Sequence, residues 1–416
     1  MVYIPFVYFI LLLLFYWRKN KAWTVDVAAV SILVLVSFFA ILIDVWDLYG
    51  ESGVNEKSIS AVGVVLFCVE WTVVLFPFHI LARLPIRLID EDKIKLFRFF
   101  VIFFMVFGVI LIFVNLQDLK QAMVLDAVDV KTEHYEDLGS GYKDSGQNLL
   151  LYVANLLLVI PFSTLALVWW FYSISFMKNP LWLNWGLLFL SIVPIIMATL
   201  IAGRASITYW VVEFYFCSCF FWRYIANKQR FRIITISSGV AGLIVVFFVT
   251  ITLSRFDDGI ANGPLYSFTG YAGQSINNLS SFLEYGENSP FQIGRIFPLT
   301  NKILGQSFNL GDFYDNITHY IGIQVNRFST FGGELFLDLG WLGLLVFLAL
   351  WCVLINHSIK KQSEISFPGL IWISILFAFF TRGLFAWPFI GYYSTAGLLA
   401  AIFLYLLFHY RFKLKS

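Results

Sequence analysis

The chain contains repeated apolar runs that are long enough to cross a lipid bilayer. The hydrocarbon core of a bilayer takes about 20 apolar residues of α-helix, and a helix satisfies all its backbone hydrogen bonds within the span. The sequence therefore predicts an all-α integral membrane protein with about eleven transmembrane helices. The candidate spans are 2–17, 23–49, 58–82, 97–116, 148–175, 182–202, 206–225, 233–254, 336–357, 367–386 and 388–410.

Composition supports this class. Of the 416 residues, 60% are hydrophobic and 13% are charged, whereas a soluble domain has about a quarter charged. The net charge of +2 argues against nucleic-acid binding, which requires a clustered basic surface. The four cysteines lie in apolar runs without the spacing of a zinc site or a disulfide framework; they are Cys68, Cys217, Cys219 and Cys352.

The basic residues predict the orientation in the membrane. Eighteen of the 28 lysines and arginines fall in alternate loops, and cytoplasmic loops carry this excess. The N-terminus is then outside, the C-terminus is cytoplasmic, and residues 1–416 form a single membrane domain. Two long loops lie outside, the acidic segment 117–147 and the segment 255–335 between predicted helices 8 and 9. In the latter, short helices are expected around Ser275–Leu283 and Phe313–Val325.

Motifs for common cofactors are absent from the sequence. It contains no P-loop, no dinucleotide-binding glycine turn, no HExxH pair and no Cys/His cluster, so we expect no cofactor and no metal site. The arginines predicted outside are the remaining candidates, because arginine binds phosphate oxygens with two parallel hydrogen bonds. The alternative is that they are interfacial anchors with local ion pairs. They are Arg204, Arg255, Arg295, Arg327 and Arg382.

Two carboxylates fall well inside predicted helices. Glu70 lies near the middle of span 58–82, and Glu213 lies within span 206–225. Charged groups inside a membrane are costly and usually face a cavity or a partner. The pattern leaves open a buried, hydrogen-bonded acid and a functional group.

The second half of the chain resembles a family of bacterial enzymes. Gly203-Arg204, the segments Gly270–Ile276 and Gly294–Leu299, and above all Ser329–Gly343 are similar to the oligosaccharide repeat-unit polymerases, the O-antigen polymerase family. The similarity covers residues from about 190 to 345. Some members have a fixed arginine-to-glycine spacing from which this sequence departs, so only the arginines carry over.

The resemblance implies glycosyl transfer at the outer face of the bacterial cytoplasmic (inner) membrane. A growing glycan on undecaprenyl diphosphate is the donor, and a lipid-linked repeat unit is the acceptor, giving O-antigen or capsular polysaccharide. The arginines would bind the diphosphate, and His319, Glu334 and Asp338 are the candidate general bases. The implied partners are the lipid-linked oligosaccharide, membrane lipids, and a flippase and chain-length regulator of the same pathway.

Two other functions remain open at this stage. An O-antigen ligase would transfer finished glycan to a lipid A core, but the external loop lacks the His-Asn pairing associated with that family. A polysaccharide flippase or other transporter would have two similar halves and short loops on both sides. The unequal halves and the one large external loop count against transport.

Overall fold

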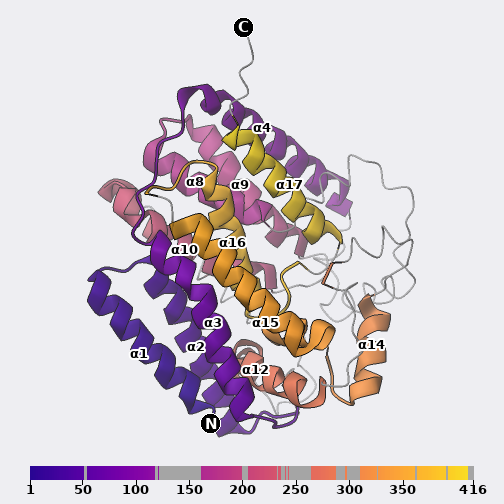
Figure 1. Cartoon of the computed structure of the whole chain (residues 1–416). Helices are drawn as coiled ribbons and strands as arrows, with labels where there is room; N and C mark the ends of the chain where they lie inside the picture. Colours follow the sequence, from indigo (N-terminus) through magenta and orange to yellow (C-terminus); the bar gives the residue numbers. More distant parts are fainter. Residues whose placement is uncertain are drawn as a thin grey trace. The chain divides into compact units, whose positions relative to one another are not determined.

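Apart from one isolated β-bridge between Ile86 and Ile365, every regular element described in this computed structural model is helical (Figure 1). The description covers residues 1–50, 54–117, 161–198, 205–235 without 232, 264–286, 296–297, 310–360 without 326, 363–389 and 392–410, with the single positions 120, 239 and 242.

Five of the described helices are long and apolar enough to cross a membrane, which makes the chain a multi-pass membrane protein by helix length and hydropathy. They cover Val25–Trp46, Ala61–Leu81, Lys93–Val114, Leu181–Ala198 and Phe331–Val353. Shorter apolar helices occupy Phe162–Phe176, Gly369–Gly383 and Ser394–His409.

Most of the predicted spans coincide with helices. They correspond to α1 (Tyr3–Asn20), α2 (Val25–Trp46), α3 (Ala61–Leu81), α4 (Glu91–Val114), α8 (Phe162–Phe176), α9 (Leu181–Ala198), α10 (Ala205–Phe221), α15 (Phe331–Lys360), α16 (Gly369–Gly383) and α17 (Tyr392–His409). The start of span 148–175, most of span 233–254 and nearly all of the loop 117–147 lie outside the described residues.

The chain divides into two compact units. Unit 1 comprises Met1–Leu84, Asp258–Ser363 and Phe380–Gly391, and unit 2 comprises Pro85–Asp257, Glu364–Phe379 and Tyr392–Ser416. Each unit is therefore built from segments that are far apart in the sequence.

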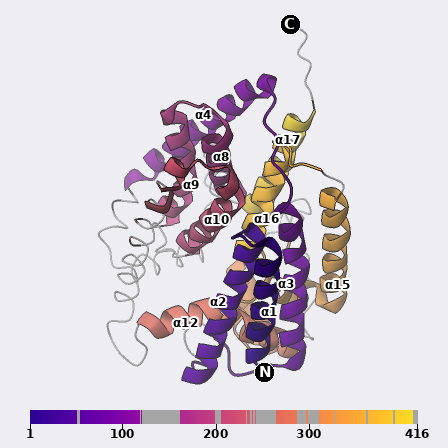
Figure 2. The same ribbon diagram turned by 90° about the vertical axis from the view of Figure 1, so that its left-hand side faces the viewer.

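In unit 1, α1, α2 and α3 lie side by side, and α12 (Pro264–Tyr285) packs against α2 and α3 (Figures 1 and 2). Ser60 caps α3, because its hydroxyl accepts a hydrogen bond from the N–H of Gly63 at 3.0 Å, a role that serine fills well. The shorter helix α14 (Leu310–Ile321) packs through Ile317 on a small apolar cluster.

The two helices α12 and α14 occupy the region where short helices were expected between 255 and 335. The polar α12 does more than cover the other helices, because it packs against α2, α3 and α15. A hydropathy profile detects apolar runs and does not identify a helix as polar as α12. Such a helix is buried because its polar side chains find hydrogen-bond partners elsewhere in the chain.

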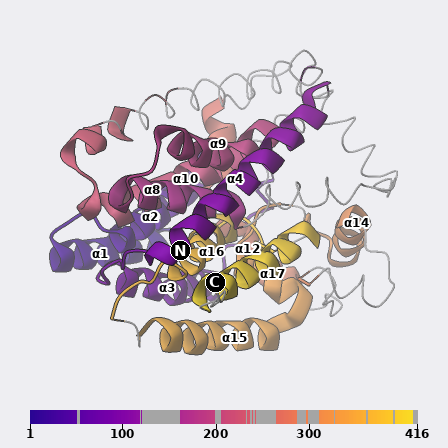
Figure 3. The same ribbon diagram turned by 90° about the horizontal axis from the view of Figure 1, so that it is seen from above.

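In unit 2, α8 is the central helix, packed against α9 and α10, and α4 packs against α9 (Figure 3). Most of α8 is buried. Its Trp169 contacts the rings of Phe97 and Phe367, with centroids 5.3 and 5.9 Å apart. Such aromatic pairs add to the stability that comes from apolar burial.

Candidate functional site

Buried polar side chains gather on α12 in unit 1. Eight of them are almost inaccessible to solvent, whereas polar side chains are usually exposed unless they are paired. They are Ser267, Thr269, Gln274, Ser275, Asn277, Asn278, Ser280 and Ser281.

Two asparagines join α12 to distant segments of the same unit. Asn278 accepts a hydrogen bond from the N–H of Asn55 at 2.9 Å and donates one to the carbonyl of Phe328 at 2.7 Å. Asn277 donates to the carbonyl of Asn55 at 3.1 Å. Because these bonds satisfy buried backbone groups, they offset the cost of placing polar side chains in the interior.

Glycines let α12 approach its neighbours closely. A β-carbon at Gly273 would overlap the backbone of Phe39 and Ala40 in α2, and one at Gly63 in α3 would overlap the side chain of Ser280. The backbones can therefore pack more tightly than larger side chains would permit.

The beginning of α15 is a separate helical segment. Thr330 caps its N-terminal turn. The hydroxyl of Thr330 accepts a hydrogen bond from the N–H of Gly333, and its backbone carbonyl accepts one from the N–H of Glu334. Gly340 has φ 64° and ψ −169°, a conformation that is nearly restricted to glycine. The segment from Phe331 to Leu339 is thus set off from the long helix that follows, although the apolar run continues through the break.

This segment carries two of the three predicted general bases. Glu334 and Asp338 are 2% and 1% exposed, and their spacing of four residues places them on the same face of the helix. Glu334 was predicted at the end of the external loop 255–335 and Asp338 at the start of the span 336–357, and the structure adds that both side chains are buried within the fold. Burial follows from the packing of this segment against α3 and α12.

A third carboxylate, from α3, lies against the first turn of this segment. Glu70 is fully buried, and its Oε2 occupies the position that a β-carbon of Gly332 would take, with the hydroxyl of Thr330 close by. Among the described residues, neither oxygen of Glu70 has a partner at normal hydrogen-bonding geometry. No group of three or more His, Cys, Asp or Glu side chains in the described ranges could hold a metal ion.

Two of the five predicted arginines lie in unit 1 near this segment. Arg327, four residues before α15, donates through Nε to Gln324 at 2.6 Å and through Nη1 to the carbonyl of Val54. Partial burial lowers the pKa of its guanidinium from the usual value. Arg382 lies in the last turn of α16, next to Gly383, which approaches Phe331 and Trp71.

Of the other predicted site residues, the structure describes only His319. His319 is exposed in the last turn of α14. Arg204, Arg255 and Arg295 lie outside the described residues. The site described below as the α15 site therefore consists of Glu70, Trp71, Arg327, Arg382 and the segment Ser329–Asp338.

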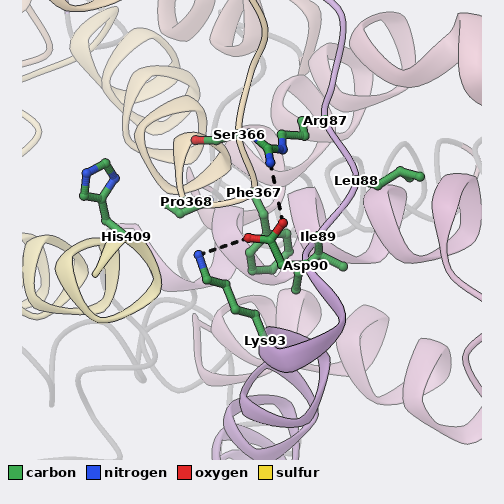
Figure 4. Close-up of a pocket in the computed structure, with 9 residues that line it drawn as sticks. All are labelled: Arg87, Leu88, Ile89, Asp90, Lys93, Ser366, Phe367, Pro368 and His409. Carbon is green, nitrogen blue, oxygen red and sulfur yellow. Dashed lines mark ion pairs between the residues drawn. The ribbon is translucent and has the colours of Figure 1, made fainter. Parts of the chain in front are cut away.

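A separate polar pocket lies in unit 2 (Figure 4). It has a volume of about 250 Å³ and is lined by Arg87, Asp90, Lys93 and His409, among others. Asp90 pairs with Arg87 at 3.7 Å and with Lys93 at 3.4 Å. Because these charges already pair with one another, the pocket is a weaker candidate for a functional site than the α15 site.

No protein-family model, curated protein or solved structure matches the chain. The functional argument therefore depends on the residues of the α15 site.

Sequence reasoning identified some members of this site and missed others. Glu70 was noted as an acid inside a helix, but its neighbours could not be assigned, because Gly332 is far away in the sequence. Trp71 gave no signal, since an aromatic residue in an apolar run is ordinarily part of the core. The polar stretch Gln274–Ser281 was the one available sign that α12 lines a polar interior.

Proposed function

We propose that the chain is a membrane glycosyltransferase that polymerises oligosaccharide repeat units linked to undecaprenyl diphosphate. The observation that supports this most is the gathering of buried carboxyl groups and two arginines around the beginning of α15. Most of the sequence run that resembles the repeat-unit polymerases, Ser329–Gly343, forms this same segment.

The chemistry of the reaction calls for these residue types. The bond from the anomeric carbon to the diphosphate breaks, so negative charge develops on the leaving group and must be stabilised. Arg327 and Arg382 are the described residues proposed for this role, and Arg204, Arg255 and Arg295 complete the proposed set. A general base accelerates attack by the acceptor hydroxyl, and the candidates from sequence are Glu334, Asp338 and His319.

The proposed orientation places this chemistry at the outer face of the bacterial cytoplasmic membrane. Eleven transmembrane helices, an external N-terminus and a cytoplasmic C-terminus would put the loop 255–335 outside. A flippase would then deliver the lipid-linked repeat units, and a chain-length regulator would act on the product. O-antigen and capsular polysaccharide are both compatible products.

Transport is the second candidate function, supported by the unpartnered carboxylate of Glu70 inside a membrane helix. Intramembrane acids of this kind also occur along substrate and proton pathways. Transport alone would require no breakage of a glycosidic linkage to the diphosphate.

An assay with purified protein separates these functions. The protein in detergent is mixed with undecaprenyl-diphosphate-linked repeat units, and the products are separated on a gel. We expect a ladder of polymer lengths from the wild type and no ladder from the double variant Arg327→Ala, Glu334→Gln. A folded wild-type protein that leaves only single repeats, yet moves the lipid-linked substrate across vesicle membranes, would replace the polymerase proposal with transport.

A further inference from the structure

Several polar atoms without partners are concentrated where α3 meets α15. Both carboxyl oxygens of Glu70, the indole Nε1 of Trp71 and the hydroxyl of Ser329 are buried and have no hydrogen-bond partner at normal geometry among the described residues. The hydroxyl of Thr330 lies beside the Glu70 carboxyl group. Glu70, Trp71 and Ser329 all adjoin the first turn of α15. Glu70 lies against Gly332, Ser329 lies against Gly333, and the ring of Trp71 contacts that of Phe331 with centroids 5.5 Å apart.

This arrangement is costly for a purely structural contact. Each buried polar atom without a partner loses its hydrogen bonds to water, and an unpaired carboxylate is the most costly of them. Apolar side chains of the same size would pack in this position without that cost. Beside the first turn of α15 the three residues offer one N–H donor, one hydroxyl and one carboxyl group, the kinds of group that form hydrogen bonds with a sugar hydroxyl.

We infer that the contact between α3 and α15 is the binding site for the acceptor sugar, and that Glu70 accepts the proton of its attacking hydroxyl. This inference rests on the proposed function and assigns the general base within it. The indole N–H of Trp71 and the hydroxyl of Ser329 would bind and orient the sugar. Glu334 and Asp338 then lie on the segment that closes over it.

The step balances as a direct displacement. The acceptor O–H bond breaks and its proton passes to a carboxylate oxygen of Glu70. The hydroxyl oxygen forms a bond to the anomeric carbon of the donor glycan, while the bond from that carbon to the diphosphate oxygen breaks and its electron pair leaves with the lipid diphosphate. Release of the proton from Glu70 to water restores the carboxylate.

The break at Gly340 provides a means of access to the buried site. Because its backbone conformation interrupts α15, the segment Phe331–Leu339 can shift without unwinding the long helix behind it. A shift of the first turn would separate Gly332 from Glu70 and expose the carboxylate, Trp71 and Ser329 to the acceptor.

The test compares Glu70→Gln with Glu213→Gln, a matched change at another buried glutamate inside a helix, in α10 of unit 2. Gln keeps the size of the side chain and loses the basic oxygen. A general base contributes about 10²- to 10⁴-fold in rate. We therefore expect Glu70→Gln to lower kcat for polymerisation by at least about 100-fold, with the acceptor KM close to that of the wild type. Glu213→Gln should retain wild-type kinetics.

Two outcomes would overturn the inference while the wild type forms polymer. One is near wild-type kcat in Glu70→Gln, and the other is an equal loss in Glu213→Gln, which would indicate a general effect of removing intramembrane acids. If Glu70→Gln does not fold, Trp71→Phe and Glu70→Asp take its place. Trp71→Phe should raise the acceptor KM about tenfold through one lost hydrogen bond, and Glu70→Asp should lower kcat. Unchanged kinetics in both would refute the assignment. A wild type without polymerase activity would instead refute the proposed function and this inference together.

Discussion

The Oε2 atom of Glu70 occupies the space that a β-carbon at Gly332 would fill. Position 332 can therefore hold only glycine unless the carboxylate moves. Gly332→Ala should displace Glu70 in the closed site and lower the rate of polymerisation, while overpacking costs about 1–3 kcal/mol of stability. Polymer ladders and thermal unfolding in detergent measure the two effects. Gly369→Ala is the control, because its nearest neighbours lie at ordinary contact distance, 3.4 Å. Full activity in Gly332→Ala would show that Glu70 need not hold this position.

A second glycine fixes the packing of α12. A β-carbon at Gly273 would meet the backbone of Phe39 and Ala40, which cannot rotate aside as a side chain can. Gly273→Ala should therefore push α12 away from α2 and lower the free energy of unfolding by about 3 kcal/mol, the upper part of the range for overpacking. The effect should exceed that of Gly332→Ala in the same thermal unfolding assay. Equal stability of Gly273→Ala and the wild type would contradict the close approach of the two helices.

Arginine at position 327 should not be replaceable by lysine. The guanidinium bonds two partners at once through Nε and Nη1, whereas lysine has a single ammonium group. Loss of one charge-assisted bond costs about 1.5–3 kcal/mol, or roughly 10- to 100-fold in rate, so Arg327→Lys should shorten the polymer. Arg87→Lys is the control, because the side chain of Arg87 forms exposed ion pairs with Asp90 and Glu364. A normal ladder from Arg327→Lys would assign this arginine to anchoring.

The distribution of lysine and arginine predicts the side of the membrane on which each loop lies. Reporter fusions at positions 90 and 228 should report the cytoplasm, and fusions at 135 and 290 should report the outside. The physical reason is the retention of basic loops on the cytoplasmic side during insertion. Reversal of either pair would place the α15 site in the opposite compartment and remove the argument for an external reaction.

Polymerisation should continue in excess chelator. Arginines can stabilise the leaving diphosphate without a divalent ion, and the acidic residues predicted outside lack the spacing of a metal cage. The measurement is the polymer ladder from purified protein with and without chelator. Complete loss of the ladder, restored by added magnesium, would contradict this prediction.

The sequence predicted the apolar part of the fold well and the polar interior poorly. Helices such as α2 and α3 follow directly from long apolar runs, because a helix of about 20 apolar residues is stable in the hydrocarbon core of the bilayer. The hydrogen-bond partners of α12 could not be predicted from apolar runs, because they lie far away in the sequence. Asn278, for example, bonds to Asn55, which is 223 positions away. The break at Gly340 was hidden for a different reason, because the apolar run continues across it and only the backbone angles reveal it.

The same limits apply to the candidate site. Glu334 and Asp338 were found through a resemblance in sequence, which gives residue types but not their surroundings. Their burial, and the approach of Glu70 from α3, depend on how helices pack in three dimensions. Arg382 illustrates the point, because its place beside the α15 site follows from the contact of Gly383 with Phe331 and Trp71.

The polar face of α12 has a consequence for how the protein is made. A helix so rich in serine, threonine and asparagine gains little by entering lipid alone, since each unpaired polar group would be costly there. Its partners in α2, in α3 and around Asn55 are synthesised well before it. The earlier segments are therefore made before α12 can pack against them, and its partners Phe328 and Leu384 are made after it. A quality-control protease or chaperone that recognises exposed polar groups within the membrane would act before α12 has packed against its partners.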